Sequence, residues 1–100
     1  MILNAPANTI DQLVIPKQTD SIRYVLRGYA CSETAGTAAT AEAIIIHGMD
    51  GTGEQIVPPI NFSADGFDIK FFPSPIPIPN GLYLDRVSGN TTFVFYVDKE

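Results

Sequence analysis

The chain has 100 residues, which is enough for one domain with a single core, because a chain of this size buries roughly 65% of its unfolded surface. Six basic residues stand against eleven acidic ones, and the resulting net charge of -5 repels phosphate backbones and anionic lipid. Nucleic acid and membrane surfaces are therefore disfavoured as partners. Hydrophobic residues make up 45% of the chain and charged residues only 17%, which favours a surface partly covered by another subunit or protein.

The N-terminal segment, Met1 to Ile10, has no positive charge and no long apolar run, so it fits neither a secretory signal nor a membrane span. Its Asn and Pro content predicts an extended N-terminal arm over residues 1–10 that is mobile or lies on a neighbouring subunit. Residues 11–100 are expected to form a single β-sandwich domain. Cys31 is the only cysteine, so this domain forms no internal disulfide and depends on packing for its stability.

The first half of the domain begins with Asp11 to Pro16, a short extended piece that its proline limits to the edge or end of a strand. The next segment, Ser21 to Cys31, alternates: Ile22, Tyr24, Leu26 and Ala30 fall on one face, and Arg23, Val25, Arg27 and Tyr29 on the other. The first half of residues 32–41 is expected to be a loop, because a glycine and several threonines disfavour a helix there. Thr40 to His47 contains three consecutive isoleucines, which predict a central strand buried on both sides.

The second half opens with a glycine-rich turn from Gly48 to Gly53, followed by a strand over Gln55 to Ile60 that its two prolines force to an edge or bend. After a further turn, Phe67 to Phe71 alternates between apolar and polar residues. We expect Phe67, Ile69 and Phe71 to point into the core and Asp68 and Lys70 to point outward. A proline then stands at every second position from Pro73 to Pro79, which predicts a polyproline-like path and excludes a central strand.

Two further strands, Leu82 to Val87 and Thr91 to Val97, close the chain around a turn at 88–90. The whole pattern predicts an all-β fold, an antiparallel β-sandwich or jelly roll of about seven or eight strands.

Reactive chemistry has weak support in this sequence. The turn from Gly48 to Gly53 lacks the Gly-Lys-Ser/Thr ending of a phosphate loop, and Glu54 would face the anion. His47 is the only histidine, and it is expected to be a structural residue at a strand end, since neither a nucleophile nor an orienting group is indicated beside it. Cys31 also lacks an evident activating partner. We therefore expect no catalytic site and no cofactor.

Two binding chemistries remain open. Turn carboxylates could gather around calcium, although their spacing matches no loop motif; these are Asp50, Glu54, Asp65, Asp68 and Asp85. Four tyrosines could stack on sugar rings, namely Tyr24, Tyr29, Tyr83 and Tyr96, while five phenylalanines are assigned to the core: Phe62, Phe67, Phe71, Phe93 and Phe95. Tyrosines on outer faces are equally suited to protein contacts.

The order of elements from Ala41 to Val97 resembles that of small all-β proteins of tailed bacteriophage virions, and the Asn-Gly-Leu-Tyr segment from Asn80 to Tyr83 is the most specific part of this likeness. The resemblance implies a non-enzymatic particle component: a capsid cement or decoration protein, or a neck or tail accessory protein, that forms homo-oligomers. The dense prolines from Pro73 to Pro79 depart from the pattern. Residues 1–40 lie outside the resemblance.

The function expected from the sequence is a capsid cement protein on the virion surface, made in the host cytoplasm, which bridges neighbouring shell subunits as a homotrimer bound to the major capsid protein. The alternative is a carbohydrate-binding or host-adhesion module of a phage tail or neck. Candidate protein contacts are taken from the arm, the proline segment and one outer tyrosine: Ile2, Leu3, Pro6, Ile10, Pro73, Pro75, Ile76, Pro77, Ile78, Pro79 and Tyr83.

Overall fold

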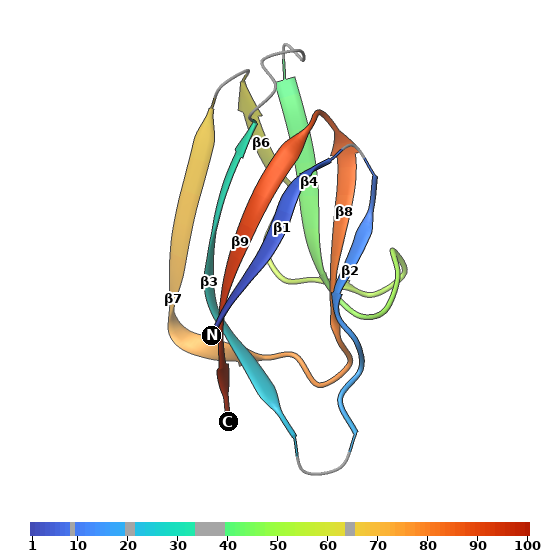
Figure 1. Cartoon of the computed structure of the whole chain (residues 1–100), viewed down its shortest axis with the longest axis vertical. Coiled ribbons are helices and arrows are strands. Elements are labelled where there is room, and N and C mark those ends of the chain that lie inside the picture. The colour runs from blue at the N-terminus through green and yellow to red at the C-terminus, as the bar shows by residue number, and fades with distance from the viewer. Residues whose placement is uncertain (9, 20–21, 34–39, 64–65) are drawn as a thin grey trace.

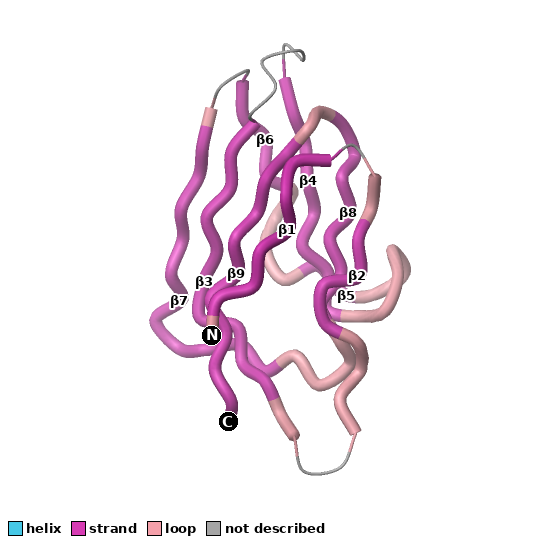
Figure 2. The backbone as a smooth tube through the Cα atoms, viewed as in Figure 1, coloured by secondary structure: helices cyan, strands magenta, loops and turns pink. Residues whose placement is uncertain are grey.

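A computed structural model of the chain describes residues 1–8, 10–19, 22–33, 40–63 and 66–100. Within these residues nine strands form two antiparallel sheets, and no helix is present (Figures 1 and 2). The prediction of an all-β fold is confirmed. Most of the loop expected within 32–41 lies outside the described residues, as does Asp65, and the side chain of Phe62 is not described.

The two sheets interleave segments that are distant in the sequence. The first sheet has the order β1-β9-β3-β7, formed by Ile2–Asn8, Thr91–Lys99, Tyr24–Glu33 and Phe67–Pro77. The second sheet has the order β2-β8-β4-β5, formed by Gln12–Ile15, Leu82–Ser88, Thr40–His47 and Glu54–Gln55, and β6 (Ile60–Ser63) also pairs with β4. Strands β1 and β7 are therefore the two edges of the first sheet, and Figure 1 shows β7 outermost on the left.

Strand pairing follows one simple rule: β1 pairs with β9, β2 with β8, β3 with β7, and β4 with β6. The chain thus runs as one long antiparallel hairpin that turns back between β4 and β6. Successive strand pairs along this hairpin belong alternately to the first and the second sheet. The prolines interrupt the strand expected over Gln55 to Ile60, because Val57 to Pro59 links β5 to β6 instead of pairing.

The core lies between the sheets and draws on both of them. Phe93 and Phe95 of β9 are fully buried and stack with ring centroids 5.5 Å apart, opposite Ile45 of β4 and Leu84 of β8 in the same cluster. Strand β4 is central, as predicted, since β8 lies on one side and β5 and β6 on the other. Alternation along β9 places every second side chain in this core.

The segment expected to be an N-terminal arm is mostly strand β1 of the first sheet. Its residues pair with β9, from Ile2 opposite Tyr96 to Asn8 opposite Thr91, and Ala5 is fully buried. Side-chain pattern does not predict this pairing, because Asn and Pro residues interrupt any alternation and the hydrogen bonds are made by the backbone.

The prediction for β7 was wrong about which face is buried. Phe67, Ile69 and Phe71 point to solvent, with exposed fractions of 75%, 58% and 61%, while Asp68 and Lys70 lie on the side of the second sheet. Alternation fixes only that neighbouring side chains point to opposite faces; the register on β3 decides which face is which.

That register depends on an irregularity in β3. Between Leu26 and Gly28 the pairing with both β7 and β9 shifts, so that Leu26 and Tyr29 both reach the core. Strict alternation had been expected to place these two side chains on opposite faces. Gly28 is needed at this point, because a Cβ there would clash with the backbone carbonyl oxygen of Lys70 and would lie 2.8 Å from the ring of Phe71. The close approach of two strands is a common reason for glycine inside a strand.

Candidate functional site

The strongest candidate site is the solvent side of the first sheet, where apolar side chains from all four strands lie next to one another. Cross-strand rows on this side run from Phe67 to Ser32 and Thr92, from Ile69 to Ala30, Val94 and Asn4, and from Phe71 to Gly28, Tyr96 and Ile2. We call the set Phe67, Ile69, Phe71, Ala30, Val94, Tyr96 and Ile2 the outer apolar face. Contiguous exposed apolar surface of this kind is typical of protein contact sites.

Two aromatic rings organise the centre of the outer apolar face. Phe71 reaches across Gly28 to Tyr96, with ring centroids 5.2 Å apart and ring planes inclined by 33°. The absence of a side chain at Gly28 allows this contact. A shallow hollow of about 240 Å³ lies beside Phe67 and Ile69, over Ala30 and Val94. The face therefore offers fixed aromatic surface together with a depression that a partner side chain can fill.

Between Phe67 and Phe71, the opposite side of β7 is polar and does not close against the second sheet. Asp68 and Lys70 line a groove of about 420 Å³ whose other wall is the link from Val57 to Asn61. Within it the Tyr29 hydroxyl donates to the Asp68 carboxylate at 3.0 Å. Burial, followed by this hydrogen bond, raises the pKa of Tyr29 above its ordinary value. Asp68 and Lys70 thus line a polar groove, whereas Phe72, further along β7, packs against the core.

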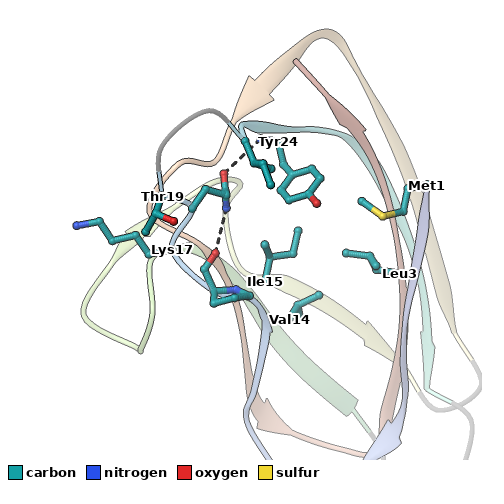
Figure 3. A pocket seen from close by; sticks show the side chains of 10 residues that line it. Met1, Leu3, Val14, Ile15, Lys17, Thr19 and Tyr24 are labelled. Atoms are coloured by element: carbon teal, nitrogen blue, oxygen red, sulfur yellow. Dashed lines mark hydrogen bonds between the residues drawn. The ribbon is translucent and has the colours of Figure 1, made fainter.

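A second hollow lies at the end of the molecule where β1 and β2 diverge. This pocket of about 370 Å³ is lined mainly by apolar side chains, including Leu3, Val14, Ile15 and Tyr24 (Figure 3). Its buried amide, Gln18, donates to the Pro16 carbonyl at 3.1 Å and accepts from the Tyr24 backbone N–H at 3.3 Å. Both polar atoms of the Gln18 amide are bonded within the chain, and the pocket offers mainly apolar surface to a ligand.

The predicted contact residues fall at several places. Exposed side chains belong to Ile2, Pro6, Ile10, Pro73, Pro75 and Pro77, and partly exposed ones to Leu3, Ile76, Pro79 and Tyr83. Ile2 and the β7 prolines share the solvent side of the first sheet with the outer apolar face, whereas Tyr83 lies on the second sheet and donates to Asp11 at 3.2 Å. Ile78 is fully buried in the core, so it is removed from the contact set.

The candidate reactive side chains have structural partners. The Nε2 atom of His47, at the end of β4, accepts the backbone N–H of Asn80 at 3.1 Å and so ties two turns together. Cys31 is buried in β3 of the other sheet. Burial, with a smaller contribution from Asp68, raises the pKa of the Cys31 thiol to about 12, which keeps it protonated and unreactive at neutral pH.

The acidic residues considered for calcium have separate neighbours. Asp50 accepts from the backbone N–H and hydroxyl of Thr52 within its own turn, at 2.9 and 2.6 Å. Asp68 bonds Tyr29, and burial, together with the nearby Asp11, raises the pKa of Asp85. Among the side chains that the structure describes, no three His, Cys, Asp or Glu residues gather closely enough to hold a metal ion.

Sequence reasoning missed the principal members of the outer apolar face. Phe67, Ile69 and Phe71 were assigned to the core, and Val94 and Tyr96 were not grouped with them. One signal could have found them: Gly28 inside a strand indicates a close approach by a large neighbour.

Comparison with known proteins yields no match: no family model fits the sequence, no curated protein is significantly similar to it, and no solved structure matches the fold. No helix in the described parts of the chain is long and apolar enough to cross a membrane. Function must therefore be argued from the outer apolar face itself.

Proposed function

We propose that this chain is a non-enzymatic virion structural protein, a capsid cement or decoration protein that binds the major capsid protein through the outer apolar face and bridges neighbouring shell subunits. One observation carries the proposal: three large apolar side chains, Phe67, Ile69 and Phe71, point to solvent side by side on one strand. A stable soluble body seldom exposes such a stripe unless a partner covers it.

The proposal includes a β-sandwich of jelly-roll type. Its support is the pairing of β1 with β9, β2 with β8, β3 with β7 and β4 with β6, with alternate pairs in alternate sheets. Jelly rolls are common in viral capsid proteins and in lectins. The likeness of Ala41 to Val97 to small virion proteins agrees with the first of these classes, and fold alone would not choose between them.

A structural role also agrees with the state of the reactive side chains. His47 is engaged by Asn80, and the Cys31 thiol is held protonated. The acidic surface favours a protein partner over packaged nucleic acid. A cement protein gains avidity from several weak contacts per particle, so each contact can be modest.

Co-sedimentation with capsids of the same virus that lack this chain tests the proposal. The variant Phe67→Thr/Ile69→Thr removes apolar area from the outer apolar face and is expected to weaken binding about tenfold or more. The matched control is Leu13→Thr/Val87→Thr, because both side chains are exposed apolar residues of the second sheet. Equal binding by wild type and the outer-face variant, or no binding by wild type, would refute this docking mode.

Carbohydrate binding is the second candidate, and one observation favours it: the exposed Phe71 ring and the partly exposed Tyr96 ring lie 5.2 Å apart on the solvent side of the first sheet, with their planes inclined by 33°. Stacking on such rings is a common mode of sugar recognition. A glycan array gives the distinguishing result, since hits that disappear in Tyr96→Ala would support adhesion. Silence on the array together with capsid binding would support cement.

A further inference from the structure

The free edge of β7 has a defined hydrogen-bonding phase. The Glu33 N–H donates to the Gly66 carbonyl at 3.1 Å, and these two residues continue the register in which Cys31 lies opposite Asp68 and Tyr29 opposite Lys70. Residues 66, 68 and 70 therefore exchange hydrogen bonds with β3, because bonded and non-bonded pairs alternate in an antiparallel ladder. The N–H and C=O groups of Phe67, Ile69 and Phe71 consequently point away from β3, toward the open edge.

The prolines protect only half of this edge. The Ile78 N–H donates to the Tyr24 carbonyl at 3.1 Å, so in the second half of the strand the even positions face β3. Pro75 and Pro77 then face the open edge, where a proline removes the donor that an incoming strand needs. The segment from Phe67 to Phe71 has no such protection and can accept another strand.

The sequence of this unprotected segment is complementary to itself. If two copies pair antiparallel with Ile69 opposite Ile69 of the partner subunit, Phe67 lies opposite the partner's Phe71. On the other face, Asp68 then lies opposite the partner's Lys70. The pairing makes about six backbone hydrogen bonds, because the odd positions are the bonded ones. Both aromatic pairs and both opposite-charge pairs are arrangements that stabilise neighbouring strands.

We propose that β7 pairs with β7 of a second copy of this chain, antiparallel and centred on Ile69, so that the two first sheets join into one continuous sheet. The charge pattern selects a second copy over an unrelated peptide: a partner strand needs a cation opposite Asp68 and an anion opposite Lys70, and β7 itself supplies both. This inference goes beyond the capsid proposal and holds whether or not the outer apolar face binds a shell.

The joined sheet places the outer apolar faces of the two subunits side by side. The interface is short, since Pro73 and the following prolines stop the pairing, and we expect it to bury less than the ~800 Å² per partner of a standard stable complex. The dimer is therefore expected to be concentration-dependent, with the molar mass rising from 10.8 kDa toward twice that value.

Sedimentation equilibrium over about a hundredfold concentration range measures this dimer. Ile69→Pro removes a donor from the centre of the pairing while leaving the bonds of β3 intact, and it is expected to raise the dissociation constant about a hundredfold. Ile69→Val is the matched control, because it keeps the donor and the β-branched side chain. Circular dichroism confirms that both variants remain folded.

Charge reversal tests the register independently. Lys70→Asp places acidic residues opposite each other in both pairs, and Asp68→Lys does the same with basic residues, so each variant alone is expected to be monomeric. An equimolar mixture restores both attractive pairs and is expected to yield a heterodimer. The mixing experiment contains no capsids. Failure of the heterodimer to form can therefore be distinguished from failure of the chain to bind a capsid.

Three results would overturn the inference. The wild-type chain could stay monomeric over the whole concentration range, or it could form a trimer, as the sequence analysis expected. The third is a dimer that neither Ile69→Pro nor Lys70→Asp weakens. A folded Asp68→Lys variant that fails to associate with Lys70→Asp would also count against this register. Thermal unfolding of Asp68→Lys is therefore measured in parallel, because Asp68 also bonds Tyr29.

Discussion

Arg86 shows how much a single buried side chain contributes to this fold. Its side chain is only 4% exposed, and its guanidinium donates to the carbonyls of Ala5, Pro6 and Ile10, at 3.3, 2.8 and 2.9 Å. It also donates to the Thr91 hydroxyl at 3.2 Å. With several acceptors, this buried guanidinium of β8 joins the start of the chain, at β1, to the first residue of β9.

Replacing Arg86 by methionine should lower the free energy of unfolding by about 2–4 kcal/mol, because one buried and two partly buried backbone carbonyls lose their donor. Urea unfolding followed by circular dichroism measures this loss. Arg27→Met is the matched control, because it makes the same substitution at an arginine whose partner, Asp98, lies on the surface. The stability of this variant should stay near that of wild type. Equal losses in the two variants would contradict the structural role of Arg86.

Tyr29 and Cys31 make stability sensitive to alkaline pH. Burial raises the pKa of Cys31 from its ordinary 9.0 to about 12, and the pKa of Tyr29 is raised above 10.0. Above these ordinary values the unfolded chain releases protons that the folded chain keeps, so the slope of stability with pH is negative. The contribution is fully present below pH 9.0 and is lost as pH rises toward about 12.

Cys31→Val isolates the thiol's part of this dependence. The variant should lose less stability than wild type between about pH 9 and pH 10, where Tyr29 contributes little. Denaturant titrations at a series of pH values give the slopes. Parallel curves for the two proteins would show that the thiol does not titrate differently in the folded and unfolded states.

At the scale of elements, β7 shows what a sequence can and cannot specify. Alternation from Phe67 to Phe71 correctly predicts a strand, and the prolines correctly exclude a central position. The buried face could not be predicted, because it depends on the irregularity near Gly28 and on the Val57 to Asn61 link, which leaves Asp68 and Lys70 in an open groove. In β9, where every inward residue is apolar or a bonded threonine, the same rule gives the right face.

Two phenylalanine substitutions test directly that Phe67 of β7 faces solvent while Phe93 of β9 lies in the core. Phe67→Thr should change the free energy of unfolding by no more than about 0.5 kcal/mol, because the ring is exposed. Phe93→Ala should cost about 3–5 kcal/mol, because its ring is fully buried and stacks on Phe95. Thermal melts of both variants provide the comparison. A large loss for Phe67→Thr would place that ring in the core after all.

For the whole molecule, the sequence predicts two antiparallel layers but not their strand order. Neighbours in the first sheet, such as β1 and β9, come from opposite ends of the chain. No local signal encodes such a pairing, since the backbone groups involved are common to all residues and the matching side chains are far apart in sequence. The outer apolar face was missed for the same reason: its members belong to four strands.

Deleting Met1 to Ala7 tests the assignment of β1 at this scale. The truncated chain should be markedly less stable, because β9 loses its neighbour, Ala5 leaves the core, and Arg86 loses two of its acceptors. Thermal unfolding monitored by circular dichroism measures the effect. An unchanged melting temperature would show that this segment is a detachable arm, as its composition alone predicts.

The two edges of the first sheet, β1 and β7, differ from one another, and this difference decides how many copies of the chain can join edge to edge. Joining β7 to β1 of another copy would repeat without limit and build a filament, whereas joining like to like stops after one step. Pro6 on β1 makes that outer margin a poor template for further addition. A chain that pairs only through β7 would therefore form a dimer and would not polymerise.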